Sequence, residues 1–243
     1  LSKGLVAAGH QVTVVTNDAA LPSPTMEFSG RRFRIIIQRS RHRPRDYLRD
    51  LYTAERRAMA EALRAAAPDI VHAHWTYEFE LAAQDSGLAH VTTARDAPWT
   101  ILRHVPDAYR LARLGVALRA RPGIRHLVVA SPYMVDAWRR QMLYRREVTV
   151  IPNMAPTLPV VSGHKRRLPT AICVADASPR KNVDLLVRAF LIVRDSIPDA
   201  RLQLVGFGLG PEDQLPLKMV AGGVADGIEF IGHVGRPALA EMI

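Results

Sequence analysis

The chain has 243 residues, 48% of them hydrophobic, which is enough to bury a core in one or two domains. Its one cysteine, Cys173, excludes an internal disulfide. No apolar run approaches the ~18–20 residues that a membrane-spanning helix needs, so the sequence predicts a cytoplasmic protein without a transmembrane segment. Lysine and arginine number 33 against 23 aspartates and glutamates. The net charge of +10 favours anionic partners, namely phosphates, nucleic acid or an acidic membrane face.

Short apolar, β-branched segments alternate with amphipathic ones along the chain. A first series of expected strands lies at 11–16, 33–37, 69–74, 90–94, 126–131 and 148–152. A second series lies at 170–175, 201–206 and 228–232. Expected helices lie between the strands, at 47–66, 106–120, 132–143, 182–195 and 236–243. Continuous apolar strands separated by helices are typical of a parallel sheet covered on both faces, so the predicted class is α/β.

The alternation stops at 153–169, where several prolines and a basic cluster interrupt it. This composition is typical of a linker. We therefore expect a first domain over 1–152, a linker over 153–169 and a second, partial domain over 170–243. Both ends of the sequence read as cut, because Leu1 already stands in helical register and "PALAEMI" stops within a helix-like pattern. The expectation is a fragment of a longer protein.

Two cations, Arg180 and Lys181, stand directly before a helix that Asn182 is expected to open. A helix N-terminus carries partial positive charge, so cations there cost about 0.3–1 kcal/mol each unless an anion is bound. This turn follows a parallel strand, at the edge where open α/β sheets bind ligands, and the pattern is that of a phosphate site. The alternative is a solvated turn in which Asp184 offsets the charges and Ser178 or Asn182 caps the helix.

A glycine-rich stretch, "LVGFGLGPE", follows the next strand of the second series. Its glycines at 206, 208 and 210 would let backbone approach a nucleotide closely. The spacing differs from the dinucleotide-binding pattern, so a tight strand–helix turn is the alternative interpretation.

Two polar pairs follow strands of the first series. His72 and His74 stand two apart in a strand and so share one face, but without a nearby set of further ligands the pair is a weak indication of a metal. One of the two could reach a substrate cleft, the other being structural. Arg95 and Asp96 follow the strand at 90–94, where they would contact substrate or form a local ion pair.

An arginine-rich stretch covers 30–50, and three interpretations of it remain open. It is a solvated basic loop, a binding face for an anionic acceptor or membrane, or a nucleic-acid site. Few aromatic residues are interleaved with the basic ones, which disfavours nucleic acid. The arginines concerned are Arg31, Arg32, Arg34, Arg39, Arg41, Arg43, Arg45 and Arg49.

Taken together and in order, these segments resemble retaining GT-B glycosyltransferases of family 4, the "glycosyl transferase group 1" type. The resemblance implies two Rossmann-like, doubly wound domains, an N-terminal acceptor domain and an incomplete C-terminal nucleotide-sugar domain. It implies transfer from a UDP- or GDP-sugar to a saccharide or lipid-linked acceptor, without metal, cofactor or nucleic acid. Polysaccharide assembly, with the basic face against an anionic membrane, is the implied setting. The matching segments are "LVAAGHQVTVVT", "PDIVHAHW", "VASPYM", "VTVIPN", "SPRKNVDLLVRAF", "RLQLVGFGLGPE" and "IEFIGHV".

The resemblance also implies roles for single residues. Lys181 falls on the family's catalytic lysine, which neutralises the donor diphosphate, and Arg180 stands beside it. The loop expected near the nucleotide base and ribose consists of Gly206, Phe207 and Gly208.

The chain departs from the family pattern at two sites. Ala175 and Asp176 stand where the family usually has a glycine–arginine pair. Arg95 stands where a histidine usually precedes the aspartate, so the acceptor- or sugar-facing candidates are His74, Arg95 and Asp96. The first strand with its Gly-rich loop and a downstream glutamate pair are also missing, so we expect the fragment alone not to turn over a donor. A catalytically inactive GT-B relative that serves as a binding or partner subunit is the alternative function.

Overall fold

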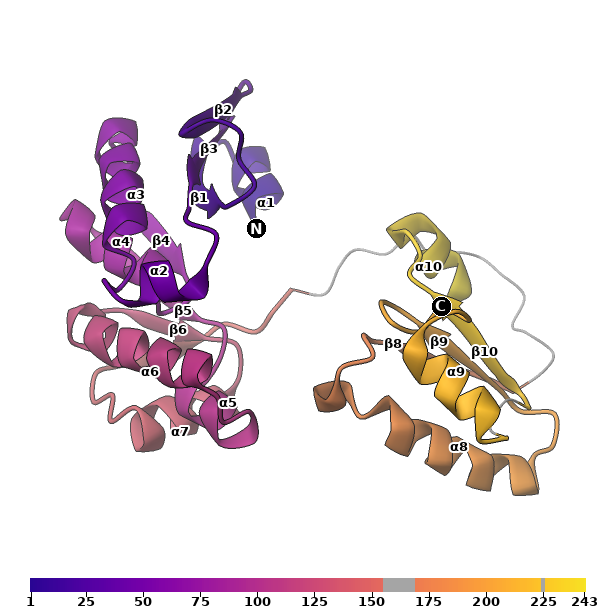
Figure 1. Cartoon of the computed structure of the whole chain (residues 1–243). Helices are drawn as coiled ribbons and strands as arrows, with labels where there is room; N and C mark the ends of the chain where they lie inside the picture. The colour runs from indigo at the N-terminus through magenta and orange to yellow at the C-terminus, as the bar shows by residue number, and fades with distance from the viewer. Residues whose placement is uncertain (155–168, 224–225) are drawn as a thin grey trace. The chain divides into compact units, whose positions relative to one another are not determined.

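A computed structural model describes residues 1–154, 169–223 and 226–243. The chain divides into two compact units, Leu1–Met154 and Ala155–Ile243, which Figure 1 shows in its indigo-to-red and orange-to-yellow parts. The linker expected over 153–169 lies, apart from its ends, outside the described residues. Both units are built of helices and mainly parallel strands, so the predicted α/β class is confirmed.

The first unit contains two sheets. One has the order β1–β3–β2, with β1 parallel to β3 and β2 antiparallel to it. Its strands are β1 (Val12–Asp18), β2 (Thr25–Ser29) and β3 (Phe33–Arg39). The other sheet is parallel throughout, in the order β4–β5–β6–β7. Its strands are β4 (Val71–His74), β5 (His90–Ala94), β6 (Leu127–Val129) and β7 (Val148–Val150).

The strand β2 was not expected from the sequence. It is a short edge strand, and all but one of its five side chains are exposed. An exposed edge strand needs no apolar run, so its sequence, "TMEFS", lacks the signal used for the other strands.

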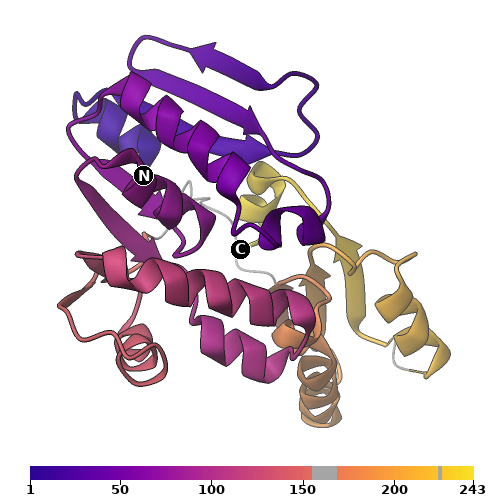
Figure 2. The ribbon, with the colours of Figure 1, turned by 60° about the vertical axis from the view of Figure 1, so that its left-hand side comes forward.

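The helices of the first unit cover these sheets, and α3 lies along β1 and β3 (Figure 2). They are α1 (Ser2–Ala7), α2 (Pro44–Leu48), α3 (Thr53–Ala66), α4 (Glu78–Ser86), α5 (Pro98–His104), α6 (Ala108–Ala120) and α7 (Pro132–Gln141). The prediction missed α4 because most of its residues are buried, including two glutamates, so the helix has no amphipathic pattern. It also missed the short α5.

The single helix expected over 47–66 is wrong, because the chain breaks between α2 and α3. Leu51 and Tyr52 have φ values of 53° and 61°, in the left-handed region. The break carries the Tyr52 ring into the core, where it is 5% exposed and stacks on Tyr47 with ring centroids 4.7 Å apart. Burial of an aromatic ring offsets the backbone strain of about 1–3 kcal/mol per residue.

The core of the first unit lies between the parallel sheet and α4, α6 and α7. Trp138 is fully buried there and meets Tyr144 edge-on at a centroid distance of 6.1 Å. A buried carboxylate, Glu80, accepts hydrogen bonds from Thr92 and from Nε2 of Gln84, and its Oε1 lies 3.2 Å from Nε2 of His90. These partners make a buried charge tolerable between α4 and β5.

The second unit has one parallel sheet in the order β10–β9–β8. Its strands are β8 (Thr170–Val174), β9 (Arg201–Val205) and β10 (Ile228–Gly232). Its helices are α8 (Val183–Ser196), α9 (Gln214–Ala221) and α10 (Arg236–Met242), and a 3₁₀ turn, Pro179–Lys181, precedes α8. The central strand contributes the fully buried Leu202 and Leu204, and α8 packs on them through Val187 and Phe190. This unit has every strand and helix that was expected of it, and α9 in addition.

Candidate functional site

The loop after β8 folds back on its own aspartate. Oδ1 of Asp176 accepts a hydrogen bond from the backbone N–H of Ser178 at 2.9 Å. Hydrogen bonding from Ser178, helped by the nearby charges of Lys181 and Arg180, holds the pKa of the Asp176 carboxyl below its usual range. The Asp176 carboxylate is therefore ionised, and it shapes the turn.

The two cations that follow occupy an exposed 3₁₀ turn. Arg180 and Lys181 are its last residues, and Asn182 leads into α8 with a left-handed φ of 51°. Among the residues that the structure describes, neither cation makes an ion pair. Asp184 pairs instead with Arg188 at 2.6 Å.

The solvated-turn alternative stays open, because both cations are exposed as it requires, but the side-chain cap that it included does not form. Asp184 makes no ion pair with either cation, and neither Ser178 nor Asn182 caps the turn or helix through its side chain. Burial raises the pKa of the Cys173 thiol, near the end of β8, and the positive charge of Lys181 partly offsets that rise. Two exposed cations are left at the carboxyl end of a parallel strand.

The glycine-rich loop after β9 packs directly against the loop after β8. A Cβ atom on Gly206, whose φ is 142°, would lie 1.7 Å from the carbonyl oxygen of Ala175. A Cβ atom on Gly208, with φ of 76°, would lie 2.8 Å from Cβ of Ala177. The N–H of Ala177 donates to the carbonyl of Phe207 at 2.9 Å. Close packing of the two loops therefore requires glycine at both positions, because any side chain there would push the loops apart.

An exposed aromatic pair stands at the ends of β9 and β10. Phe207 is 68% exposed and stacks on the ring of His233, with centroids 4.1 Å apart and planes 12° from parallel. His233 was missed from the sequence, where only the general motif "IEFIGHV" marked its segment. Phe207 belongs to a loop that contacts the loop of the two cations, so its exposed ring could stack on a nucleotide base while the cations meet the phosphates.

In the first unit, residues from three strand ends meet. Arg95 donates to Oδ1 of Asn153 at 2.8 Å and contacts Nδ1 of His74 at 3.2 Å. Burial, with the charges of His72 and Arg95, lowers the pKa of His74 to about 4. His74 is therefore neutral near pH 7, with Nδ1 as the acceptor and the proton on Nε2.

His72 has a different environment from His74, although their rings lie 4.2 Å apart on one face. Nε2 of His72 lies 2.7 Å from Oγ1 of Thr93, so this ring nitrogen has a hydrogen-bond partner within the protein. Across the described ranges, no three histidine, cysteine or acidic side chains gather as a metal would require. The expected independence from metal stays a prediction.

Asp96 is turned away from Arg95, and the local ion pair considered above does not form. Its Oδ1 accepts a hydrogen bond from the hydroxyl of Tyr77 at 3.0 Å, and its carbonyl accepts from Nε1 of Trp138 at 3.1 Å. Burial raises the pKa of its carboxyl. The structure thus brings His74 and Arg95 together, whereas Asp96 anchors the core beneath them.

A charged and aromatic cluster near the ends of β1 and β3 was not identified from the sequence. Arg113 donates to Glu78 at 3.0 Å and to the hydroxyl of Tyr52 at 3.1 Å, and its guanidinium lies 3.6 Å from the ring centroid of Tyr77. Its members come from separate segments and have no common motif. Only the fold reveals the cluster.

Solved structures place the fold among the GT-B glycosyltransferases. A trehalose-6-phosphate synthase studied with bisubstrate glycomimetics matches with a TM-score of 0.67 at 12% identity, covering 98% of this chain and 70% of that one. The E. coli trehalose-6-phosphate structure bound with UDP-2-fluoro glucose matches with a TM-score of 0.65 at 11% identity. That match covers 97% of this chain and 70% of the other. A further structure, of OtsA, matches at 0.65 with 11% identity, covering 98% and 70%. The predicted GT-B fold is confirmed.

The chain belongs to Glycosyltransferase Family 4, whose family model matches residues 1–157. No curated protein sequence matches it. In the part of the chain that the structure describes, no helix is both long and apolar enough to cross a membrane.

Proposed function

We propose that this protein transfers a sugar, with retention at the anomeric carbon, from a UDP- or GDP-sugar to a saccharide or lipid-linked acceptor. The observation that carries the proposal is the pair of exposed cations, Arg180 and Lys181, beside the glycine-rich loop of the second unit. Family membership and the fold support it. The bound UDP-2-fluoro glucose of the E. coli structure favours a UDP-sugar donor.

Lys181 is the proposed catalytic residue. When the bond between the anomeric carbon and the diphosphate oxygen breaks, negative charge grows on the leaving diphosphate. A cation already in place stabilises that charge at no reorganisation cost, which is commonly the largest contribution to catalysis. Because the lysine supplies this charge, a metal ion is not needed for the step.

The remaining donor contacts come from the neighbouring loops. In this proposal Arg180 neutralises the second phosphate, and the exposed ring of Phe207 stacks on the base. Gly206 and Gly208 keep the two loops in contact, so the donor would meet both at once.

The first unit is the proposed acceptor domain. His74 is neutral, and its Nε2–H can donate to a sugar hydroxyl, while Arg95 fixes the ring by bonding Nδ1. Asp96 acts at a distance from the substrate, by holding Tyr77 and Trp138 in place. We further propose a cytoplasmic protein that takes part in polysaccharide assembly and contacts an anionic membrane peripherally.

A catalytically inactive GT-B relative is the second candidate. It is favoured by the ionised Asp176 in the donor loop, because a carboxylate there repels a diphosphate. This second candidate predicts that the 243-residue chain binds a donor without turning it over. Release of free sugar or transfer from a UDP-sugar would argue for the active enzyme.

Calorimetric titration of the chain with UDP and with GDP tests the donor site. We expect Lys181→Ala to weaken binding of the preferred nucleotide about tenfold or more, since a hydrogen bond to a charged group contributes about 1.5–3 kcal/mol. Lys218→Ala removes an exposed lysine from α9 of the same unit and serves as the matched control. Equal affinity for the two variants would refute the site. Addition of EDTA should leave the affinity unchanged.

A further inference from the structure

The arginines of the 30–50 stretch separate into two groups in the structure. Four have partners within the first unit, one of them Arg45, whose Nε lies 3.8 Å from Oδ1 of Asp46. Arg32 donates to the carbonyl of Gly9, and Arg34 forms a cross-strand ion pair with Glu27. Arg41 donates to Glu55 at 2.6 Å and is described below. Most of the others are exposed, so their charge is available to an anion.

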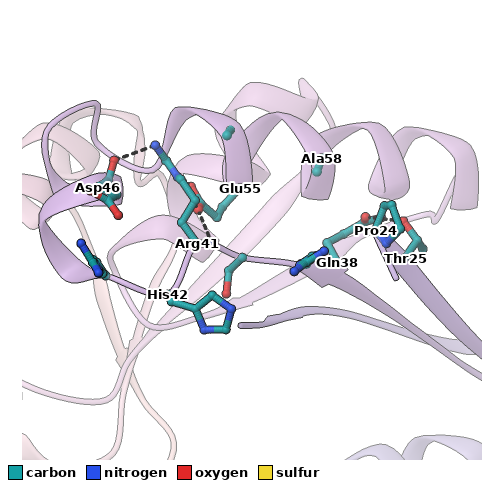
Figure 3. Close-up of a pocket in the computed structure, with 12 residues that line it drawn as sticks. Pro24, Thr25, Gln38, Arg41, His42, Asp46, Glu55 and Ala58 are labelled. Atoms are coloured by element: carbon teal, nitrogen blue, oxygen red, sulfur yellow. Dashed lines mark hydrogen bonds and ion pairs between the residues drawn. The ribbon is translucent and has the colours of Figure 1, made fainter. Parts of the chain in front are cut away.

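Two exposed arginines and one exposed histidine line one hollow of about 660 Å³ (Figure 3). Arg39 is the last residue of β3, and His42 and Arg43 lie in the segment that follows it. This volume lies within the ~300–1,000 Å³ usual for small-molecule sites. The lining also contains two carboxylates, those of Asp46 and Glu55. Oδ1 of Asp46 lies 3.8 Å from Nε of Arg45.

Arg41 separates this hollow from a second one. Its guanidinium is held by Glu55 at 2.6 Å and by Asp50 at 2.9 Å, and it donates to the carbonyl of Asp46 at 2.6 Å. In Figure 3 the Arg41 side chain extends between Asp46 and Glu55. Arg41 is thus a neutralised wall, and the charge of the larger hollow comes from its neighbours.

The second hollow, of about 170 Å³, has a different chemistry. It shares Ser40, Arg41, His42 and Glu55 with the first, and the rest of its lining is mainly tyrosines and an arginine–glutamate pair, with Asn17 and Ala19. Its aromatic residues are Tyr47, Tyr52 and Tyr109. Its charged residues are largely compensated, since Arg113 pairs with Glu78. Tyrosine rings and paired polar groups suit the C–H faces and hydroxyls of a sugar.

We propose that these two adjoining hollows form the part of the acceptor site that recognises the acceptor's charge, in addition to the His74 and Arg95 pair, and that the acceptor is an anionic saccharide. The tyrosine-walled hollow holds a sugar ring, and Arg39, His42 and Arg43 bind a phosphate or carboxylate attached to it. A neutral sugar would leave the arginines without a counter-charge, so the site selects for the anion. This inference rests on the proposed function, because it names the acceptor of that transfer.

Binding of small probes to the 243-residue chain tests the proposal. Glucose 6-phosphate and glucuronate should each bind at least about tenfold more tightly than glucose, the difference expected for charge-assisted hydrogen bonds. Raising the salt concentration should narrow this difference. Equal binding of all three sugars would overturn the proposal.

A pair of double variants separates the site from general charge. Arg39→Ala with Arg43→Ala should bring the affinity for glucose 6-phosphate down to that for glucose. Arg31→Ala with Arg49→Ala removes the same charge from exposed positions outside both hollows and should change it less than twofold. Equal losses in the two double variants would contradict a specific site. Circular dichroism of each variant confirms folding.

Two further comparisons complete the test. The first distinguishes a sugar phosphate from a membrane surface as the source of the anion, and the second distinguishes failure of the acceptor site from failure of the donor site. Vesicles of phosphatidylglycerol in phosphatidylcholine should not compete with glucose 6-phosphate; competition together with no sugar-phosphate selectivity would show a membrane face and overturn the acceptor site. UDP titrated in parallel should lose affinity with Lys181→Ala and keep it with the Arg39 and Arg43 double variant. If the unsubstituted chain failed to bind UDP but kept its preference for glucose 6-phosphate over glucose, only the donor site would be refuted.

Discussion

The substitution Gly206→Ala should disrupt the platform formed by the loops after β8 and β9. The added Cβ would lie 1.7 Å from the carbonyl oxygen and 2.7 Å from the carbonyl carbon of Ala175. Neither strand end can move away freely. The N–H of Ala175 donates to Val205 at 2.9 Å, and the N–H of Gly206 donates to Gly232 at 2.8 Å.

The size of the effect follows from two contributions. A φ of 142° is strained for alanine, at a cost of about 1–3 kcal/mol, and a backbone clash adds a similar amount. We therefore expect the second unit to lose at least ~3 kcal/mol of its free energy of unfolding, or about a hundredfold in its opening equilibrium. The tryptophans all lie in the first unit, so their fluorescence cannot report this change.

Hydrogen exchange measured by mass spectrometry resolves the two units. Peptides that contain β9 should exchange about a hundredfold faster in Gly206→Ala, while peptides that contain β5 should be unchanged. Gly222→Ala is the control, because its Cβ would lie 3.4 Å from the nearest carbonyl oxygens and its φ is −82°. If Gly206→Ala exchanged like Gly222→Ala and still bound UDP, the packing argument for this glycine would be refuted.

Three other substitutions test separate parts of the structure. Phe207→Ala should leave stability unchanged, because the ring is 68% exposed, and should weaken UDP binding in calorimetry by about 1–3 kcal/mol if the ring stacks on the base; unchanged affinity would remove it from the site. Hydrogen bonding to Glu80 raises the pKa of His90, so protonated His90 stabilises the first unit fully below the unfolded-state pKa of about 6.5 and loses this effect as pH rises through the raised folded-state pKa. Urea unfolding followed by tryptophan fluorescence should show that loss above pH 6.5, and His90→Gln should abolish the dependence; an equal dependence in the variant would contradict the assignment. Trp138→Ala should destabilise the first unit by about 3–5 kcal/mol, whereas Trp99→Ala, at a position 44% exposed, should cost under about 1 kcal/mol; hydrogen exchange of β5 distinguishes them, and similar costs would contradict the described core.

Elements with a clear hydrophobic period could be predicted, and those shaped by burial or strain could not. The strands of the second unit and α8 have clear apolar patterns, and their bounds in the structure lie close to the expected ones. The break at Tyr52 depends on a ring finding Tyr47 in the core, and no local signal announces it. The buried glutamates of α4 depend likewise on partners from β5 and α6.

The candidate sites show the same division. Lys181 could be singled out because a cation directly before a helix N-terminus, which itself carries partial positive charge, is unfavourable unless an anion binds there. The reason for Gly206 lies in the carbonyl of Ala175, which belongs to another loop, so the sequence indicated a nucleotide loop without the packing that demands the glycine. The arginines of 30–50 look alike in the sequence, and only their contacts separate Arg41, held by two carboxylates, from Arg39, which is exposed.

Titration of the ¹⁵N-labelled chain with UDP, followed by amide chemical shifts, tests the proposed donor site most directly. We expect the largest chemical-shift changes on the amides of 176–182 and 206–208, and we expect Lys181→Ala to diminish these changes together. Changes confined to the strand ends of the first unit, or no changes at millimolar UDP, would contradict it.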